Sequence, residues 1–215
     1  TFFNVITGLY TPDSGSFELA GKPYEPTEVH LVAQAGIART FQNIRLFAEM
    51  TALENVMVGR HVRTSSGLLG AIFRTATFKA EELAIEQRAR ELLDYVGIAN
   101  LADYKARTLS YGDQRRLEIA RALATDPQLI ALDEPAAGMN ATEKVQLRAL
   151  IDKIRRDHRT VLLIEHDVKL VMGLCDRVTV LDYGRVIAQG TPAQVQRDPQ
   201  VIEAYLGTQS GDGGH

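Results

Sequence analysis

The feature that most constrains this chain is an apolar run that ends abruptly in two acidic residues. Residues 129–135 read Leu-Ile-Ala-Leu-Asp-Glu-Pro, so Asp133 and Glu134 follow four apolar residues and precede a helix-incompatible proline. The run has the length of a buried strand. Because successive side chains of a strand point to opposite sides, we expect the two carboxylates to have different roles. Taken alone, the pattern fits equally a buried strand that ends in a solvated acidic turn.

Strand-like and helix-like segments alternate after this run. Candidate strands at residues 160–165 and 177–181 are separated from each other and from the acidic run by candidate helices at residues 142–156 and 168–174. Such alternation predicts a parallel sheet with helices on its faces.

A helical segment interrupts this pattern earlier in the chain. Thr51 and Glu54 form a capping-box pattern, residues 79–96 are amphipathic, and Ser110 can cap a further helix. We therefore expect an α/β core formed by residues 1–50 and 126–206, with a helical subdomain inserted at residues 51–125. Residues 207–215 are expected to form a flexible Gly-rich tail.

Composition excludes several classes of protein. With 215 residues, 45% of them hydrophobic, the chain has room for one substantial domain with a lobe. With a net charge of −3, the chain has no excess of positive charge of the kind that indicates nucleic-acid binding, so we expect no nucleic-acid partner. The single cysteine, Cys175, excludes a disulfide framework. No apolar run approaches the roughly 18 residues of a transmembrane helix, so membrane association would require a partner protein.

A second motif lies ahead of the acidic run. Residues 109–116 read Leu-Ser-Tyr-Gly-Asp-Gln-Arg-Arg, which places Ser110 and Gly112 at the start of a helix. The free N–H groups and the dipole of a helix start can bind phosphate. An ordinary capped amphipathic helix, with Asp113 closing the box, accounts for the same residues.

Together, the two motifs resemble the signature motif and Walker B strand of ATP-binding-cassette (ABC) ATPases. Further landmarks occur in the family's order: residues 39–42, Arg-Thr-Phe-Gln, resemble the Q-loop, residues 136–140 the D-loop, and His166 the switch histidine. The resemblance implies a P-loop NTPase fold. This fold has a RecA-like parallel-sheet core, an inserted helical subdomain and a small antiparallel β portion.

The resemblance also implies roles for individual residues. Glu134 would polarise the attacking water, His166 would contact the γ-phosphate, and Gln42 would join them in catalysis, while Gln42 and Asp133 would hold Mg²⁺. The residues expected to contact ATP are Thr1, Ser110, Tyr111, Gly112, Asp113 and Asn140. Simpler interpretations exist for two of these side chains: Gln42 as a surface-loop residue and His166 as a polar residue at a strand end.

The phosphate-binding loop G-x-x-x-x-G-K-[ST] does not occur in the sequence. Residues 1–9 resemble the helix that follows this loop in the family, so we expect the loop to precede Thr1. Without it, the chain by itself is expected not to bind ATP normally.

Finer features resemble importers of branched-chain or other hydrophobic amino acids. They include residues 39–47, Pro-Ala-Ala-Gly at 135–138, residues 164–172, and Tyr111 and Asn140 where the broader family has glycine and aspartate. The resemblance implies an ATP-hydrolysing subunit on the cytoplasmic face of the bacterial inner membrane. Implied partners are membrane permease subunits, an identical or different second ATPase subunit, and indirectly a periplasmic or extracellular solute-binding protein.

Three alternatives remain. The chain could serve another ABC transporter, or it could be a chromosome- or repair-associated ATPase with the same motifs. The latter proteins interpose long coiled coils, whereas residues 42–110 are few and contain no sustained heptads. The third alternative is a degenerate chain that acts as an interaction module, and the retention of Glu134 and His166 argues against it.

Overall fold

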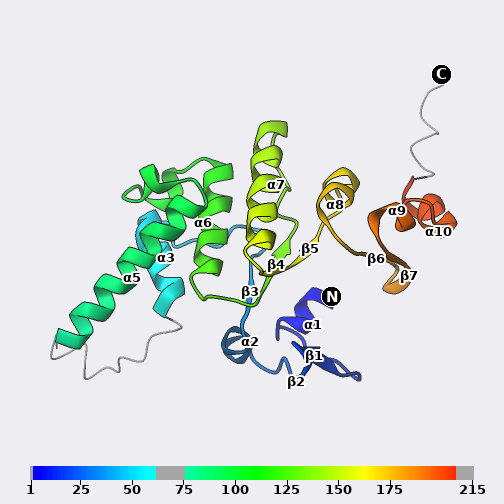
Figure 1. Ribbon diagram of the computed structural model, residues 1–215, viewed down its shortest axis with the longest axis horizontal. Coiled ribbons are helices and arrows are strands. Elements are labelled where there is room, and N and C mark those ends of the chain that lie inside the picture. Colours follow the sequence, from blue (N-terminus) through cyan, green and yellow to red (C-terminus); the bar gives the residue numbers. More distant parts are fainter. Residues whose placement is uncertain (1, 62–75, 207–215) are drawn as a thin grey trace. The chain divides into compact units, whose positions relative to one another are not determined.

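The computed structural model describes residues 2–61 and 76–206, which form two compact units (Figure 1). The first unit ends at Ile164 and the second begins at Glu165. Thr1 and the expected tail at residues 207–215 lie outside the described residues.

A three-stranded parallel sheet runs through the first unit (Figure 1). Its strands, in order across the sheet, are β3 (Ile37–Arg39), β4 (Leu129–Asp133) and β5 (Thr160–Ile164). Ile130 and Leu132 of the central strand are fully buried, as expected for a parallel strand covered on both faces. The predicted parallel sheet is confirmed for these three strands, whereas the candidate strand at residues 177–181 was wrongly placed in it and forms an antiparallel hairpin of the second unit.

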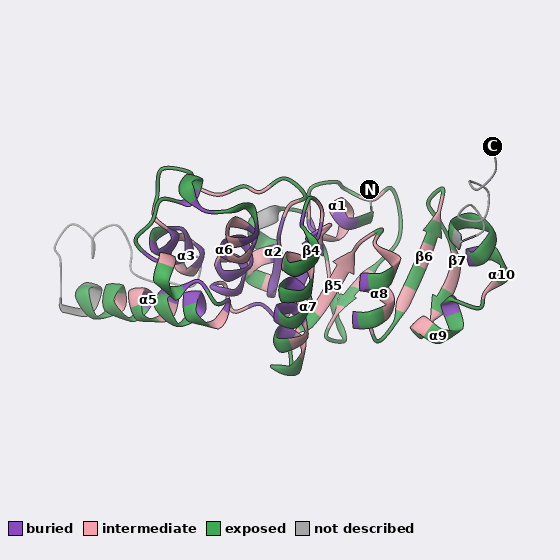
Figure 2. Cartoon of the chain, turned by 90° about the horizontal axis from the view of Figure 1, so that it is seen from above, coloured by how far each residue is buried: buried purple, intermediate pink, exposed green. Residues whose placement is uncertain are grey.

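Helix α7 (Ala141–Arg156) packs beside this sheet. Its buried residues recur at helical spacing (Figure 2) and are Leu147, Leu150, Ile151 and Ile154. Arg148 and Ala149, which lie between Leu147 and Leu150 in the sequence, are exposed. The helix is therefore amphipathic, with one apolar stripe.

The segment before the sheet is short and mixed. It contains α1 (Phe2–Ile6), a hairpin of β1 (Phe17–Leu19) and β2 (Lys22–Tyr24), and α2 (Val29–Ala35). Helix α1 ends before residue 9 because Gly8 adopts a φ of 72° and the N–H of Leu9 bonds to the Asn4 carbonyl.

Helices make up the described part of residues 52–123. They are α3 (Ala52–His61), α5 (Ala76–Tyr95), the 3₁₀ turns Ala99–Leu101 and Ala106–Thr108, and α6 (Tyr111–Leu123). The predicted capping box of α3 is present: Glu54 N–H donates to Thr51 Oγ1 at 3.1 Å, and Thr51 N–H donates to Glu54 Oε2 at 2.7 Å. Figure 2 shows that α6 is largely buried.

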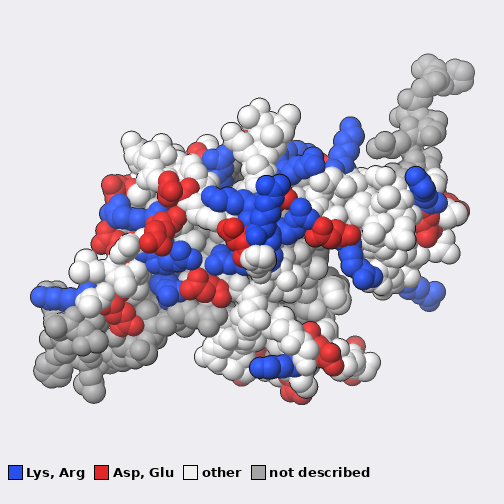
Figure 3. Space-filling view, in the orientation of Figure 1, with Lys and Arg blue, Asp and Glu red and all other residues white. Residues whose placement is uncertain are grey.

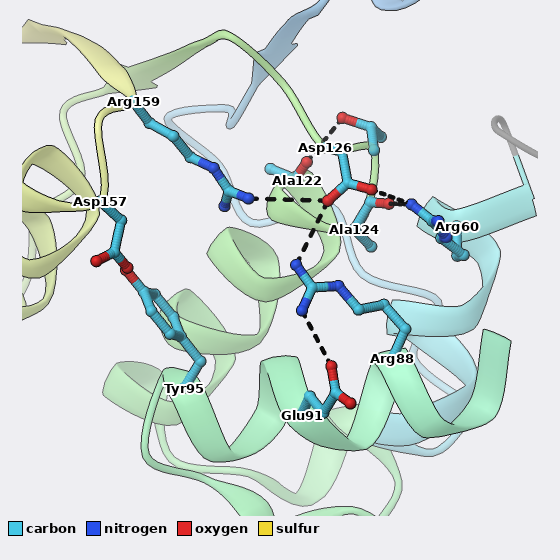
Figure 4. Close-up of polar contacts among 10 residues, drawn as sticks. Arg60, Arg88, Glu91, Tyr95, Ala122, Ala124, Asp126, Asp157 and Arg159 are labelled. Atoms are coloured by element: carbon cyan, nitrogen blue, oxygen red, sulfur yellow. Dashed lines mark hydrogen bonds and ion pairs between the residues drawn. The ribbon is translucent and has the colours of Figure 1, made fainter. Parts of the chain in front are cut away.

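Charged side chains of both signs are interleaved on the face shown in Figure 3. One cluster joins the helices to the sheet (Figure 4). Asp126, between α6 and β4, forms ion pairs with Arg60 of α3, with Arg88 of α5 at 3.4 Å and with Arg159 next to β5 at 3.7 Å. Because Asp126 is 39% exposed, each pair contributes little by itself, and the cluster mainly fixes the arrangement of these elements.

Tyr95 links the end of α5 to the end of α7 (Figure 4). Its hydroxyl donates to Asp157 Oδ2, just after α7, at 2.6 Å, and Lys153 Nζ lies 3.9 Å from the centre of its ring. Partial burial raises the pKa of Tyr95, and the Asp157 carboxylate raises it further. The phenol therefore remains a hydrogen-bond donor.

The second unit combines short helices with a hairpin. Its elements are α8 (Val168–Leu174), the antiparallel strands β6 (Val178–Asp182) and β7 (Arg185–Gly190), α9 (Pro192–Val195), α10 (Pro199–Val201) and a π-helical turn, Ile202–Leu206. Tyr205 closes this unit by donating to the Leu181 carbonyl at 2.5 Å. In the part of the chain that the structure describes, no helix has both the length and the apolar character needed to cross a bilayer.

Gly59 lets α3 approach α6 closely, and this contact generates a prediction. A Cβ at Gly59 would lie 2.3 Å from the Arg121 carbonyl oxygen, closer than real Cβ contacts. Although alanine is the better helix former by about 1 kcal/mol, we expect Gly59→Ala to lower the free energy of unfolding by about 2 kcal/mol through overpacking. Urea denaturation measures the change.

The matched control for this change is Ala84→Gly at an exposed position of α5. It should lose only the helix-propensity difference of about 1 kcal/mol. A Gly59→Ala protein that is more stable than the parent would contradict the close packing.

Candidate functional site

The two adjacent acids lie at the carboxyl end of β4 and have different partners. Asp133 is the last residue of the strand, and its Oδ2 accepts a hydrogen bond from Arg39 Nη2 at 2.9 Å. Arg39 also donates to Thr7 Oγ1 at 2.7 Å, and its guanidinium lies over the Phe3 ring at 4.5 Å. Asp133 is thus held by a cation that is itself fixed by residues of the first segment.

Glu134 turns away from the strand. Its φ of 44° lies in the left-handed region, which non-glycine residues adopt at a cost, and its N–H bonds to the Ile164 carbonyl at 2.9 Å. The Glu134 carboxylate accepts a hydrogen bond at Oε2 from Gln42 Nε2, at 2.9 Å. The structure therefore brings together two of the three side chains predicted to be catalytic.

Gln42 lies in an irregular segment that follows β3. Its side chain is exposed, but the backbone around it is held from α6: Arg115 donates to the carbonyls of Phe41 and Gln42 at 2.7 and 2.8 Å. Glu118 accepts from the Phe41 N–H at 3.2 Å. Burial raises the pKa of Glu118, an effect that nearby Arg115 opposes.

The predicted motif at the start of α6 forms a capped helix. Ser110 Oγ accepts from the Asp113 N–H at 3.2 Å and donates to the Asp113 carboxylate at 2.6 Å. The Tyr111 ring lies beside Gly138, where an added Cβ would be 3.5 Å from it. Gly112 lies so close to Glu143 of α7 that a Cβ added at this position would be 2.8 Å from the Glu143 carboxylate. Residues 110–113 and 136–140 are therefore neighbours.

Asn140 caps α7. Its Oδ1 accepts from the Glu143 N–H, and its own N–H donates to Glu143 Oε2, both at 2.9 Å. The side chain therefore has a structural role in the helix start. The predicted contact of Asn140 with ATP stays a prediction.

His166 belongs to the second unit and is exposed between β5 and α8. The next residue, Asp167, caps α8 by accepting the Leu170 N–H at 3.1 Å. His166 lies in the second unit and Glu134 in the first, so the predicted role of His166 in catalysis stays a prediction. Thr1, the remaining predicted ATP contact, lies outside the described residues.

The side chains at the end of β4 fit Mg²⁺ by their chemistry. Asp133 offers a carboxylate and Gln42 an amide oxygen, and Mg²⁺ takes oxygen ligands from one or two protein groups together with water and substrate phosphates. Among residues 2–61 and 76–206, no three His, Cys, Asp or Glu side chains cluster as a metal cage would require.

Comparison with known proteins identifies the family. A family model described as "ABC transporter" matches residues 1–137. A second model, "Branched-chain amino acid ATP-binding cassette transporter", matches residues 185–210. The chain belongs to the ABC transporter ATPase family. The fold class predicted from the two motifs is thereby confirmed.

Relatives of this ABC ATPase cover nearly the whole chain. BraF of Pseudomonas aeruginosa, a high-affinity branched-chain amino acid transport ATP-binding protein, is 46% identical over 96% of this chain and 82% of its own length. LivG of Escherichia coli, described in the same words, is 44% identical with the same coverage. Among solved structures, the ADP conformation of MJ1267, an ATP-binding cassette, has a TM-score of 0.80 and 32% identity over 96% of this chain and 82% of that one.

Three residues of the ABC ATPase site had no assigned role in the sequence interpretation. They are Arg39, which pairs with Asp133, and Arg115 and Glu118, which hold the segment of Gln42. For Arg115 and Glu118, the sequence contained one signal. Their opposite charges are three residues apart in a helix that is otherwise apolar on that side.

The capping box of Asn140 generates a prediction about stability. Asn140→Ala removes the acceptor for the Glu143 N–H, so we expect the free energy of unfolding to fall by about 1 kcal/mol. Asn140→Asp keeps a good cap and should retain the stability of the parent. Urea unfolding of both variants measures this, and equal losses would show that the cap is not the source of the effect.

Proposed function

We propose that this chain is the ATP-hydrolysing subunit of an ABC importer for branched-chain or other hydrophobic amino acids. The observation that carries the proposal is the contact between Gln42 and Glu134 beside Asp133, at the carboxyl end of β4. Ligands of open parallel sheets bind at this edge. The identities to BraF and LivG support the transporter class.

Glu134 is proposed to polarise the attacking water. Its carboxylate is half-buried and oriented by the Gln42 amide, as a general base requires. Gln42 and Asp133 would hold Mg²⁺, which when bound neutralises charge on the phosphates. Arg39 keeps the Asp133 carboxylate in place in the structure described. One oxygen of this carboxylate would coordinate the metal.

ATP is proposed to lie between two subunits, as the resemblance implies. Ser110 to Asp113 would serve the nucleotide of the partner ATPase subunit, since α6 begins there and the start of a helix can bind phosphate. Asn140 and Thr1 are proposed as further ATP contacts, and His166 is proposed to contact the γ-phosphate. Identical and non-identical partner subunits both remain possible.

At the level of the transporter, the partners are proposed to be membrane permease subunits and, indirectly, a periplasmic or extracellular solute-binding protein. The subunit would act on the cytoplasmic face of the bacterial inner membrane. The match at residues 185–210 to a branched-chain amino acid transporter model favours this substrate class. A lipopolysaccharide export protein, LptB of Haemophilus influenzae, is less similar, with 33% identity over 97% of the chain.

The catalytic assignment predicts a separation of binding from turnover. In the subunit assembled with its transporter, Glu134→Gln keeps the shape of the side chain and an oxygen that accepts from Gln42, so ATP binding should persist. The turnover number should fall about 10²–10⁴-fold, because an amide cannot take a proton from water. Binding of labelled ATP and release of phosphate measure the two effects.

The matched control is Glu91→Gln at an exposed position of α5, which should hydrolyse ATP at the parent rate. Rapid hydrolysis by the Glu134→Gln protein would remove Glu134 from its proposed role.

The substrate assignment predicts a transport defect. Deleting the gene from its host should strongly reduce uptake of labelled leucine, while uptake of a labelled sugar stays normal. A plasmid copy of the parent gene should restore leucine uptake, and a Glu134→Gln copy should not. Normal leucine uptake in the deletion strain would contradict the proposed substrate.

A further inference from the structure

Helix α6 contains a buried ion pair that the proposed mechanism does not use. Arg115 and Glu118 are 0% and 1% exposed, and Arg115 Nη1 lies 2.8 Å from Glu118 Oε2. Burying two charges costs several kcal/mol per ion, and well-packed apolar residues often give equal or greater stability. Arg115 Nε, moreover, is buried without a hydrogen-bond partner in the described structure. Stability alone is therefore a weak explanation for this pair.

The partners of the pair point to another task. Arg115 donates through Nη1 to the Phe41 carbonyl at 2.7 Å and through Nη2 to the Gln42 carbonyl at 2.8 Å. Glu118 Oε1 accepts the Phe41 N–H at 3.2 Å. Phe41 and Gln42 belong to no helix or strand. The ion pair therefore forms hydrogen bonds to the backbone N–H and carbonyl of Phe41 and to the carbonyl of Gln42, in a segment without regular structure.

The same segment presents the catalytic contact. The Gln42 side chain extends from the held backbone to Glu134 Oε2, 2.9 Å from its Nε2. Its side chain is exposed, so local packing does little to fix its position. The backbone bonds from Arg115 and Glu118 then become the main constraint on where this amide can reach.

Arg115 also contacts the first turn of its own helix. Its Nη2 donates to the Tyr111 hydroxyl at 3.2 Å, and its guanidinium lies 5.8 Å from the centre of the Tyr111 ring. The hydroxyl end of that ring also lies beside Gly138, in the segment that follows Glu134. A planar guanidinium can serve several acceptors at once in fixed directions, which a lysine ammonium cannot do in the same way.

We propose that Arg115 is a positioning residue for hydrolysis: with Glu118, it fixes the backbone at Phe41 and Gln42 so that the Gln42 amide meets Glu134. Through Tyr111, this position depends on the motif at the start of α6. The inference rests on the proposed ATP hydrolysis and assigns a function to residues that do not themselves touch ATP or water.

The first test is Arg115→Lys in the subunit assembled with its transporter. Lysine preserves the charge beside Glu118 but cannot bond both carbonyls and the Tyr111 hydroxyl together. We expect the turnover number for ATP to fall about tenfold, because small displacements of catalytic groups are costly, while KM for ATP is unchanged. Arg90→Lys, at an exposed position of α5, makes no contact with Phe41 or Gln42 among the described interactions and should keep the parent kinetics.

A double-mutant cycle separates positioning from general destabilisation. If Arg115 acts through Gln42, then Arg115→Lys should have no further effect on the turnover number of a Gln42→Ala protein. Likewise, Tyr111→Phe should lower turnover in the parent but not in the Arg115→Lys background. Multiplicative losses in the first cycle would overturn the proposal, since they would show that Arg115 acts independently of Gln42.

A second variant keeps the test decisive where Arg115→Lys does not fold. The paired change Arg115→Met with Glu118→Leu removes both buried charges and fills the site with apolar groups, so thermal stability should be retained. Turnover should still fall about tenfold because the backbone bonds are lost. Parent turnover in this variant would overturn the proposal. Failure of the parent to hydrolyse ATP, in contrast, would reject the proposed function itself.

Discussion

The parallel pairing of β4 with β3 and β5 determines where the site of the first unit forms. Parallel strands end at the same edge of a sheet, so the residues that follow β3 and β4 must come close together. Gln42 and Glu134 are far apart in the chain, yet they meet at 2.9 Å for this reason. The same pairing gives Glu134 its backbone partner, the Ile164 carbonyl at the end of β5. Without this sheet register, the contact between Gln42 and Glu134 would not exist.

A change of backbone direction then gives two neighbouring acids different surroundings. Asp133 completes the strand and meets Arg39, whereas Glu134 adopts a positive φ and meets Gln42. Strained backbone of this kind persists only where surrounding structure fixes it. The bond to Ile164 supplies part of that restraint. One acid is thus paired with a permanent cation and the other with a neutral amide.

Much of this fold was predictable because its signals are local. The capping box that begins with Thr51 and the N-cap formed by Ser110 each lie within four residues, and the β4 run is apolar up to Asp133. Strand β2 was not predicted, since Pro23 favours a turn; an isolated two-stranded hairpin tolerates it because its edges need no further pairing. The hydrogen bond from Arg115 to the Gln42 carbonyl was not predicted either, because it joins residues that only the folded chain brings together.

Helix α6 is well suited to link its first turn to the Gln42 segment, because it has little freedom to move in parts. Gly59 brings α3 against its last turn, and Gly112 brings Glu143 against its first. Tyr111, Arg115 and Glu118 lie at successive turns of one face, at spacings of four and three residues. A close-packed helix shifts as a body rather than deforming. Any displacement of Tyr111 along the helix axis would therefore carry Arg115 with it, and with Arg115 the backbone of Gln42.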